Sequence, residues 1–286
     1  MMKPIPNVFI VGAMKSGTTS LHNYLDEHPE ICMSQQPKET QYFVKELNWS
    51  KGEEWYLSLF SPTDGVRVIG ESSTDYAKLP RYQGVAQRIS QFNRDARIVY
   101  IMRDPIQRSI SHYWWEVQWS AEGRPMLEAI KSIKDITDIS YYAMQLASYI
   151  DTFGSDRIMT LTLEELSANP QQTLSGLFEW LGVDPSFVPP SLNRRDNAAT
   201  QKVSKVWGAS YISRLRGTPA WDVLKRVIPS QVRAGAIKTL SRPVERDSGD
   251  VEQAIDYLRP IQQQQTAELS QLLNRQFPEW TTLYGT

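Results

Sequence analysis

The stretch from Asn7 to Leu21, which reads NVFIVGAMKSGTTSL, constrains the fold more than any other part of the chain. An apolar run at 8–11 ends at Gly12, and a helical pattern begins at Ser20. A buried strand that turns at glycine and continues as a helix directs backbone N–H groups and the positive end of the helix dipole at one place. The stretch therefore predicts a strand, an anion-binding loop and a helix.

The spacing of glycine and lysine within this loop indicates which class of phosphate compound it binds. Loops that bind nucleoside triphosphates read G-x-x-x-x-G-K-[ST], with lysine directly after the second glycine. Gly12 and Gly17 keep that frame, but Thr18 follows Gly17 and the lysine stands earlier, at Lys15. A lysine at this position is expected to reach over a bound phosphate. The alternative is an ordinary helix-capping turn with a solvated lysine.

Apolar runs and helical patterns alternate along the rest of the chain, which predicts an α/β fold. We expect a P-loop three-layer α/β/α sandwich with a mostly parallel central sheet, whose ligands bind at the carboxyl ends of the strands. It is expected to form a single domain over 1–286, with a basic helical insertion or lid at about 207–250. Strands are predicted at 8–11, 31–33, 66–70, 97–102 and 157–163, helices at 20–27, 51–60, 82–91, 105–115, 126–134, 141–153 and 256–280, and a loop at 135–140.

A second candidate anion site follows the predicted strand at 97–102, where the sequence reads R-D-P-x-x-R-x-x-S. Arg103 leaves the end of the strand, and Pro105 suits the first turn of a helix. Ser111 lies farther along that helix. A guanidinium group and a hydroxyl group can bind one phosphate together. The alternative is an arginine that caps strand ends and a serine packed within a helix.

A candidate general base lies in the segment K-E-T-Q-Y-F after the strand at 31–33. We expect that strand to lie next to the first one, so that Glu39 reaches the phosphate loop. A carboxylate there can accept a proton from an attacking hydroxyl or amine group. The alternative is a solvated helix start, in which Glu39 interacts with the helix dipole. His112 is expected to be structural.

Composition excludes several classes of function. A formal net charge of −1 argues against nucleic acid as a partner. The single Cys32 excludes an internal disulfide and a cysteine-based zinc cluster, and with 3 histidines we expect no metal site. No apolar run approaches the ~18 residues of a membrane span, and the first residues are expected to be too short for a signal peptide. These features predict a cytoplasmic protein.

The two anchors, K-S-G-T-T after a strand and R-D-P with its later serine, resemble those of sulfotransferases that use 3′-phosphoadenosine 5′-phosphosulfate (PAPS). These motifs are most similar to those of the bacterial and heparan-type members of this family. The resemblance implies PAPS as co-substrate and no metal, with Arg103 and Ser111 at the 3′-phosphate. The K-E-x-x-F-F-type segment of carbohydrate sulfotransferases implies that Glu39 is the general base. The 5′-phosphosulfate loop would comprise Lys15, Ser16, Gly17, Thr18 and Thr19.

Two segments fit the family pattern less well. Heparan-type enzymes carry E-K-S-x-x-Y where this chain has Ser72 in place of the lysine, so the role of that lysine is vacant here or is taken by Lys38. This difference weighs against a heparan-like acceptor. The polar segment 188–206 corresponds to a loop that covers the nucleotide, and it offers Arg194, Arg195 and Lys202 as contacts or forms a solvated loop.

The resemblance implies in-line transfer of a sulfuryl group from PAPS to a hydroxyl or amine group, with Glu39 as base and Lys15 stabilising charge. The acceptor is expected to be a carbohydrate or another small molecule, and the sequence does not indicate an oligomeric state. One alternative is a P-loop nucleotide kinase or NTPase, which needs lysine after Gly17. The other is a non-catalytic nucleotide-binding module on the same fold.

Overall fold

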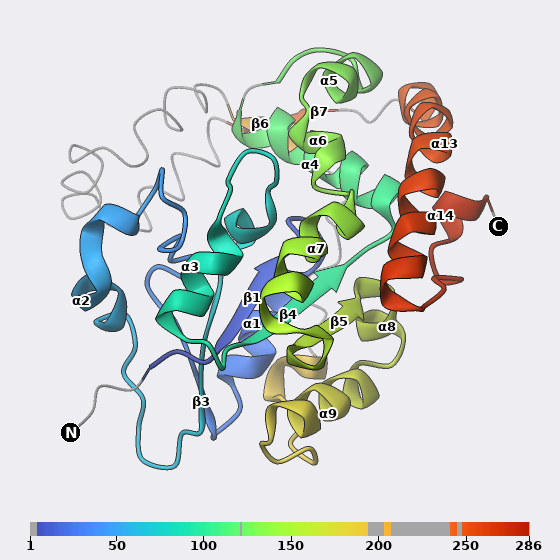
Figure 1. The fold of residues 1–286 in the computed structure, drawn as a ribbon. Helices are drawn as coiled ribbons and strands as arrows, with labels where there is room; N and C mark the ends of the chain where they lie inside the picture. The colour runs from blue at the N-terminus through green and yellow to red at the C-terminus, as the bar shows by residue number, and fades with distance from the viewer. Residues whose placement is uncertain (1–4, 121, 194–202, 207–240, 245–247, 286) are drawn as a thin grey trace.

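The computed structural model describes residues 5–120, 122–193, 203–206, 241–244 and 248–285 (Figure 1). Its centre is a sheet of five strands in the order β2-β3-β1-β4-β5, and every neighbouring pair is parallel. Helices flank both faces, so the predicted α/β fold with a parallel central sheet is confirmed. The strands are β1 (Val8–Gly12), β2 (Ile31–Met33), β3 (Val68–Ser72), β4 (Arg97–Met102) and β5 (Ile158–Thr162).

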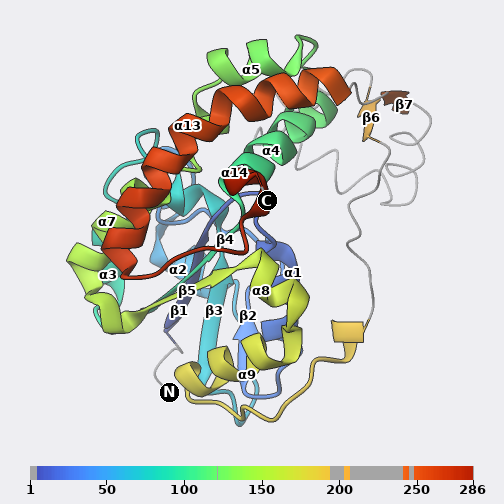
Figure 2. The same cartoon turned by 90° about the vertical axis from the view of Figure 1, so that its right-hand side faces the viewer.

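Side chains of the central strands alternate between two hydrophobic cores, as expected for strands buried on both faces. Val8 and Ile10 of β1 pack in one core, and Phe9 and Val11 pack in the other. The first core is covered by α1 (Thr18–Asp26), α8 (Leu163–Ala168) and α9 (Pro170–Leu181). The second is covered by α2 (Gly52–Leu57), α3 (Val85–Phe92), α4 (Pro105–Trp119), α5 (Met126–Ser132), α7 (Tyr142–Phe153) and α13 (Ser248–Leu273) (Figures 1 and 2).

Local sequence signals start the helices that follow β5. Thr162 accepts a hydrogen bond from the backbone of Glu165, whose side chain accepts one from the backbone of Thr162, which is a capping box at the start of α8. Pro170 occupies the first turn of α9, and Gly182 ends that helix in the left-handed conformation. These caps fix α8 and α9 against the sheet face that also carries α1.

The prediction that the second strand lies next to the first strand in the sheet is wrong. β3 lies between β2 and β1, with Ile10 opposite Ser72 in the register of β1 and β3. β3 also extends two residues beyond the predicted end at Gly70, because its pairing with β1 continues there. Glu71 and Ser72 are therefore buried members of the sheet. The segment after β2 reaches the carboxyl end of β1 only by crossing the end of β3.

Smaller differences concern the loops. The predicted loop at 135–140 contains a short helix, α6, and the predicted irregular segment ending at 206 contains β6, which pairs antiparallel with β7 and lies next to α4. Most of the predicted insertion at 207–250 lies outside the described residues. The remaining elements are α6 (Asp135–Asp138), β6 (Val203–Val206), β7 (Ser241–Val244), α14 (Thr281–Tyr284) and four 3₁₀ turns, η1 (Trp49–Lys51), η2 (Thr74–Ala77), η3 (Ser155–Arg157) and η4 (Pro190–Asn193).

Candidate active site

The turn after β1 is shaped by one glycine. Gly17 has a φ of 92°, in the left-handed region that glycine adopts without strain. A Cβ atom at Gly17 would lie 2.8 Å from Cδ1 of Leu163, so contact also disfavours a larger residue. Helix α1 begins directly after it at Thr18, and the N–H groups of a first helical turn have no acceptor inside the helix. The turn therefore presents N–H groups and a helix dipole to one side.

Positive charge is concentrated at this turn. Burial lowers the pKa of Lys15, and the nearby charges of Arg103 and Arg108 lower it further. Arg103 follows β4 directly, and β4 is the neighbour of β1 in the sheet. Positively charged side chains that lie close together repel one another. An anion that binds between them relieves this repulsion, so the arrangement favours anion binding.

The start of α4 is held by a buried carboxylate. Asp104 accepts hydrogen bonds from the backbone N–H groups of Ile106 at 3.0 Å and Gln107 at 3.1 Å, and Pro105 occupies the first helical position. This cap sets the direction in which α4 leaves the strand. Ser111 then lies two turns along the helix and faces the same cavity as Arg103.

Arg108, the second arginine of the R-D-P-x-x-R segment, is fully buried. Its guanidinium donates to Oγ of Ser140 at 2.5 Å, to the carbonyl oxygen of Met14 at 3.5 Å and to the carbonyl oxygen of Ile136. Burial lowers its pKa to about 10, which leaves it charged at neutral pH. Arg108 therefore joins α4 to the residue before Lys15. Sequence reasoning assigned it no role, although its motif position was a usable signal.

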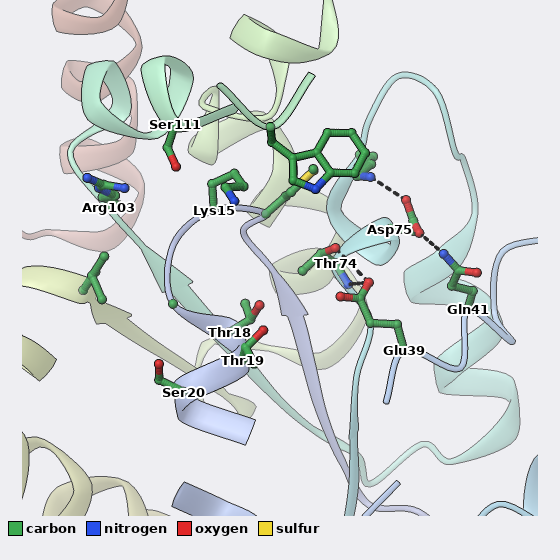
Figure 3. A pocket seen from close by; sticks show the side chains of 15 residues that line it. Lys15, Thr18, Thr19, Ser20, Glu39, Gln41, Thr74, Asp75, Arg103 and Ser111 are labelled. Atoms are coloured by element: carbon green, nitrogen blue, oxygen red, sulfur yellow. Dashed lines mark hydrogen bonds and ion pairs between the residues drawn. The ribbon is translucent and has the colours of Figure 1, made fainter. Parts of the chain in front are cut away.

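A cavity of about 640 Å³ opens beside the turn (Figure 3). This volume lies within the roughly 300–1,000 Å³ of small-molecule sites. Predicted site residues from three separate segments line it, namely Lys15, Gly17, Thr18, Thr19, Glu39, Arg103 and Ser111. Ser16 is buried and is not part of the wall. The predicted contacts Arg194, Arg195 and Lys202 lie outside the described residues.

Glu39 lies on the side of the cavity opposite Arg103, with Lys15 between them (Figure 3). Its carboxylate accepts hydrogen bonds from the hydroxyl group of Thr74 at 3.0 Å and from the backbone N–H of Thr74 at 3.3 Å. Its other oxygen lies 3.4 Å from the ammonium group of Lys38. Thr74 follows the end of β3, so β3 orients a carboxylate that belongs to the segment after β2.

Behind Glu39 lies a buried carboxylate that sequence reasoning did not single out. Glu71 accepts hydrogen bonds from four hydroxyl groups, those of Thr40 at 2.5 Å, Ser73 at 2.7 Å, Tyr56 at 2.8 Å and Tyr76 at 2.9 Å. Burial raises the pKa of Glu71, and the four hydrogen bonds oppose that shift.

Two of the hydrogen-bond donors to Glu71 are sequence neighbours of Glu39 and of its partner Thr74. Thr40 follows Glu39 in sequence, and Ser73 precedes Thr74. Ser73 also accepts a hydrogen bond from the backbone N–H of Gln41 at 3.0 Å. Glu71 therefore ties the segment after β2 to the end of β3. The sequence signals were a carboxylate at the end of an apolar strand and its place as the first residue of the segment that resembles E-K-S-x-x-Y.

The lysine that family resemblance expects at position 72 was predicted to be absent or to be replaced by Lys38. Ser72 is buried within β3, and Lys38 does not line the cavity but pairs with Glu39. The lysine that does line this side is Lys78, whose ammonium group lies 2.6 Å from a carboxylate oxygen of Asp75. Sequence reasoning missed Lys78. This residue lies six positions after Ser72, and only the 3₁₀ turn η2 between them brings its side chain to the cavity.

His112 is buried in α4 and does not line the cavity, so the expected structural role agrees with its position. Its Nδ1 lies 3.4 Å from the guanidinium of Arg108, and its Nε2 lies 3.3 Å from the carboxylate of Glu116. Burial lowers its pKa to about 4.

No group of three or more His, Cys, Asp or Glu side chains among the described residues is placed to hold a metal ion. No helix within the described ranges is long and apolar enough to cross a membrane.

Comparison with known proteins gives a family match and two similar sequences. Residues 6–231 match the family model described as the sulfotransferase domain. The chain is 34% identical over 128 residues to the membrane-associated sulfotransferase kil1 of Dictyostelium discoideum, covering 43% of this chain and 26% of that protein. It is 27% identical over 209 residues to the bifunctional heparan sulfate N-deacetylase/N-sulfotransferase 1 of Caenorhabditis briggsae, covering 65% of this chain and 23% of that protein.

The matches therefore span about a quarter of the length of these curated relatives. Among solved structures, the chain is similar to a sulfotransferase from Alicyclobacillus acidocaldarius, with a TM-score of 0.70 and 24% sequence identity. That similarity covers 97% of this chain and 99% of the other. It supports the fold described above.

Glu71→Gln is expected to lower the free energy of unfolding by about 1–3 kcal/mol, because a carboxamide cannot accept from all four buried hydroxyl donors. The same variant should speed hydrogen exchange in the segment 38–43. Urea denaturation and exchange mass spectrometry measure the two effects. Glu53→Gln, at an exposed position of α2, is the matched control and should change stability by less than about 0.5 kcal/mol. Equal effects of both substitutions would contradict the role given to Glu71.

Stability should fall as the pH drops from about 6.5 toward about 4. Below 6.5 the unfolded chain binds a proton at His112 that the native chain, with a pKa of about 4, does not bind. Between pH 7 and pH 5 this costs about 2 kcal/mol. His112→Asn should remove that part of the pH dependence in urea unfolding. His22, whose pKa burial also lowers to about 4, contributes equally to both proteins. An unchanged pH dependence in the variant would refute the assignment.

Proposed function

The chain belongs to the sulfotransferase domain family, and from this premise we propose that it transfers a sulfuryl group from PAPS to a hydroxyl or amine group of an acceptor. What supports the proposal most directly is that the anion-binding turn and the Arg103–Ser111 pair line one cavity, together with Glu39. The two anchors come from segments far apart in sequence, and β1 and β4 bring them to the same edge of the sheet.

The donor groups of the cavity fit the two anionic ends of this nucleotide. Arg103 and Ser111 supply a guanidinium group and a hydroxyl group, a suitable pair for the 3′-phosphate. Lys15 and the N–H groups at Thr18 and Thr19 suit the 5′-phosphosulfate. Bound PAPS would supply an activated sulfuryl group with a phosphate as its leaving group.

In the proposed reaction Glu39 accepts the proton of the acceptor hydroxyl while the acceptor oxygen forms its bond to sulfur. The bond between that sulfur and the bridging phosphate oxygen breaks, so the products are the sulfated acceptor, adenosine 3′,5′-bisphosphate and a proton on Glu39. Lys15 and the amides of the turn stabilise the charge that develops on the leaving phosphate. The two hydrogen bonds from Thr74 keep the carboxylate of Glu39 aimed at the cavity.

The acceptor is proposed to be a carbohydrate or another small molecule. The relatives include enzymes named for heparan sulfate, which supports a sugar acceptor in general terms. These relatives are much longer proteins, and Ser72 departs from their lysine-containing segment. We therefore do not extend their acceptor to this chain.

The kinase or NTPase alternative is not favoured, because Thr18 stands where such enzymes carry the phosphate-binding lysine. The test is a calorimetric titration with adenosine 3′,5′-bisphosphate and, separately, with ATP and Mg²⁺. Tight binding of the bisphosphate and transfer of labelled sulfate from PAPS to an acceptor panel are expected. Preference for ATP would overturn the proposal, and nucleotide binding without transfer to any acceptor would favour the non-catalytic module.

Arg103→Ala should weaken binding of adenosine 3′,5′-bisphosphate about 10- to 100-fold, because a charged hydrogen bond to the 3′-phosphate is lost. Binding of adenosine 5′-monophosphate, which lacks that group, should change by less than about twofold. Calorimetry with both nucleotides measures the difference. Equal losses for the two nucleotides would show that Arg103 does not bind the 3′-phosphate.

Lys15→Ala should lower kcat by about 10²–10³-fold, the typical loss of one group that stabilises developing charge. Single-turnover transfer of labelled sulfate measures this rate. Lys45→Ala, at an exposed position outside the cavity, is the control and should retain the full rate. A nearly normal rate for the Lys15 variant would remove this residue from the mechanism.

Glu39→Gln should abolish transfer while leaving the affinity for adenosine 3′,5′-bisphosphate nearly unchanged, because the carboxamide cannot accept the proton. The exposed Glu46, which lies near it in sequence but outside the cavity, gives the control variant Glu46→Gln. Loss of nucleotide binding in the Glu39 variant would instead assign this side chain to the architecture of the site.

A further inference from the structure

The Glu39 side of the cavity contains a pair of opposite charges that the mechanism above does not use. The ammonium group of Lys78 lies 2.6 Å from one carboxylate oxygen of Asp75, and the other oxygen accepts a hydrogen bond from the side-chain amide of Gln41 (Figure 3). The side chains of Lys78 and Asp75 are 14% and 10% exposed, and both line the cavity. A pair with so little exposure is held in one arrangement, because water screens it weakly.

Charge divides the cavity into two halves. The phosphate half, at the turn and α4, carries the cations Lys15 and Arg103. The acceptor half carries Glu39, Asp75 and Lys78, and Lys38, just outside the cavity wall, lies 3.4 Å from Glu39, so these four side chains form two pairs of opposite charge. Among the described residues that line the cavity, no other side chain is charged. Among the described residues of this half, both lysines are therefore already paired with carboxylates, Lys78 with Asp75 and Lys38 with Glu39.

We propose, on the basis of the proposed function, that Asp75 and Lys78 recognise the acceptor and select an uncharged polyhydroxyl compound over an anionic one. A carboxylate beside an ammonium group offers an acceptor and a donor of hydrogen bonds next to each other. Two neighbouring hydroxyl groups of a sugar fit such a pair, one donating to Asp75 and one accepting from Lys78. An anionic acceptor would approach the carboxylates of Glu39 and Asp75, and both described lysines of this half already pair with those carboxylates, so its charge would have to displace one of them.

The same cavity offers an aromatic side chain for the rest of such a compound. Trp115 of α4 lines the cavity and is partly exposed. An indole ring offers a flat apolar surface together with a polar edge, which matches the C–H face and the hydroxyl groups of a sugar ring. The expected acceptor thus differs in charge from a carboxylated and sulfated polymer such as heparan sulfate.

The test uses matched pairs of p-nitrophenyl glycosides, in which glucoside and glucuronide, or galactoside and galacturonide, differ only by a neutral or carboxylated C6. Calorimetry measures their binding to the full chain saturated with adenosine 3′,5′-bisphosphate. Each neutral glycoside that binds is expected to bind at least about tenfold more tightly than its carboxylated partner. Equal or tighter binding of the carboxylated partners would overturn the proposal, as would the absence of binding by every neutral glycoside.

Two variants separate this role from general effects on the site. Asp75→Asn leaves the charge of Lys78 unpaired, so the preference for the neutral glycosides should shrink about tenfold. Lys78→Met should weaken binding of the neutral glycosides, whereas Lys78→Arg should retain the preference, which keeps the test valid if the Asp75 variant does not fold. Asp64→Asn, at an exposed position outside the cavity, is the control for the loss of one negative charge.

An unchanged preference in Asp75→Asn, together with unchanged affinity of Lys78→Met for the neutral glycosides, would overturn the assignment of these residues. Failure of the wild-type chain to bind adenosine 3′,5′-bisphosphate is a separate result, because it contradicts the proposed function itself. All variants should bind this nucleotide within about twofold of wild type, since neither residue lies in the phosphate half of the cavity.

Discussion

The parallel pairing of β1 with β3 on one side and β4 on the other is the constraint on which the site depends. In a parallel sheet the carboxyl ends of neighbouring strands meet at one edge, and each strand continues there into a turn. The turn after β1 supplies amides and Lys15, the residue after β4 supplies Arg103, and the residues after β3 orient Glu39. A change in register would separate these groups even if every helix kept its length.

Buried polar residues fix the segments that carry the cavity side chains to the ends of these strands. Arg108 holds α4 to the backbone just before Lys15, and Glu71 holds the segment of Glu39 to the end of β3. Each lies behind the cavity, and each makes several hydrogen bonds at once. A buried charge that is well satisfied makes alternative arrangements costly, because any of them would leave it without partners. The cavity is thus shaped by polar contacts of residues that do not face it.

Sequence reasoning identified what is local and failed where distant segments meet. The turn at Gly17 and the Arg103–Ser111 spacing each lie within one short stretch, so their geometry follows from strand and helix periods. The order of the strands does not, because no local pattern states where a crossover places the next strand. Glu71 was given no role, because two of its four hydrogen-bond donors, Thr40 and Tyr56, come from other segments of the chain. Lys38 seemed the natural substitute for the lysine missing at Ser72, since only the folded chain brings another one to the cavity.

The cap of α4 has a consequence for how the protein is made. One oxygen of Asp104 accepts from the first turn of α4, and the other accepts from the backbone N–H of Leu283 at 3.0 Å. Two segments that are 179 positions apart in sequence are thereby joined directly beside Arg103. On the ribosome the strands emerge early and can pair, but this carboxylate lacks one of its donors until Leu283 has been synthesised. The Arg103 end of the cavity therefore takes its final form only after the segment around Leu283 has left the ribosome.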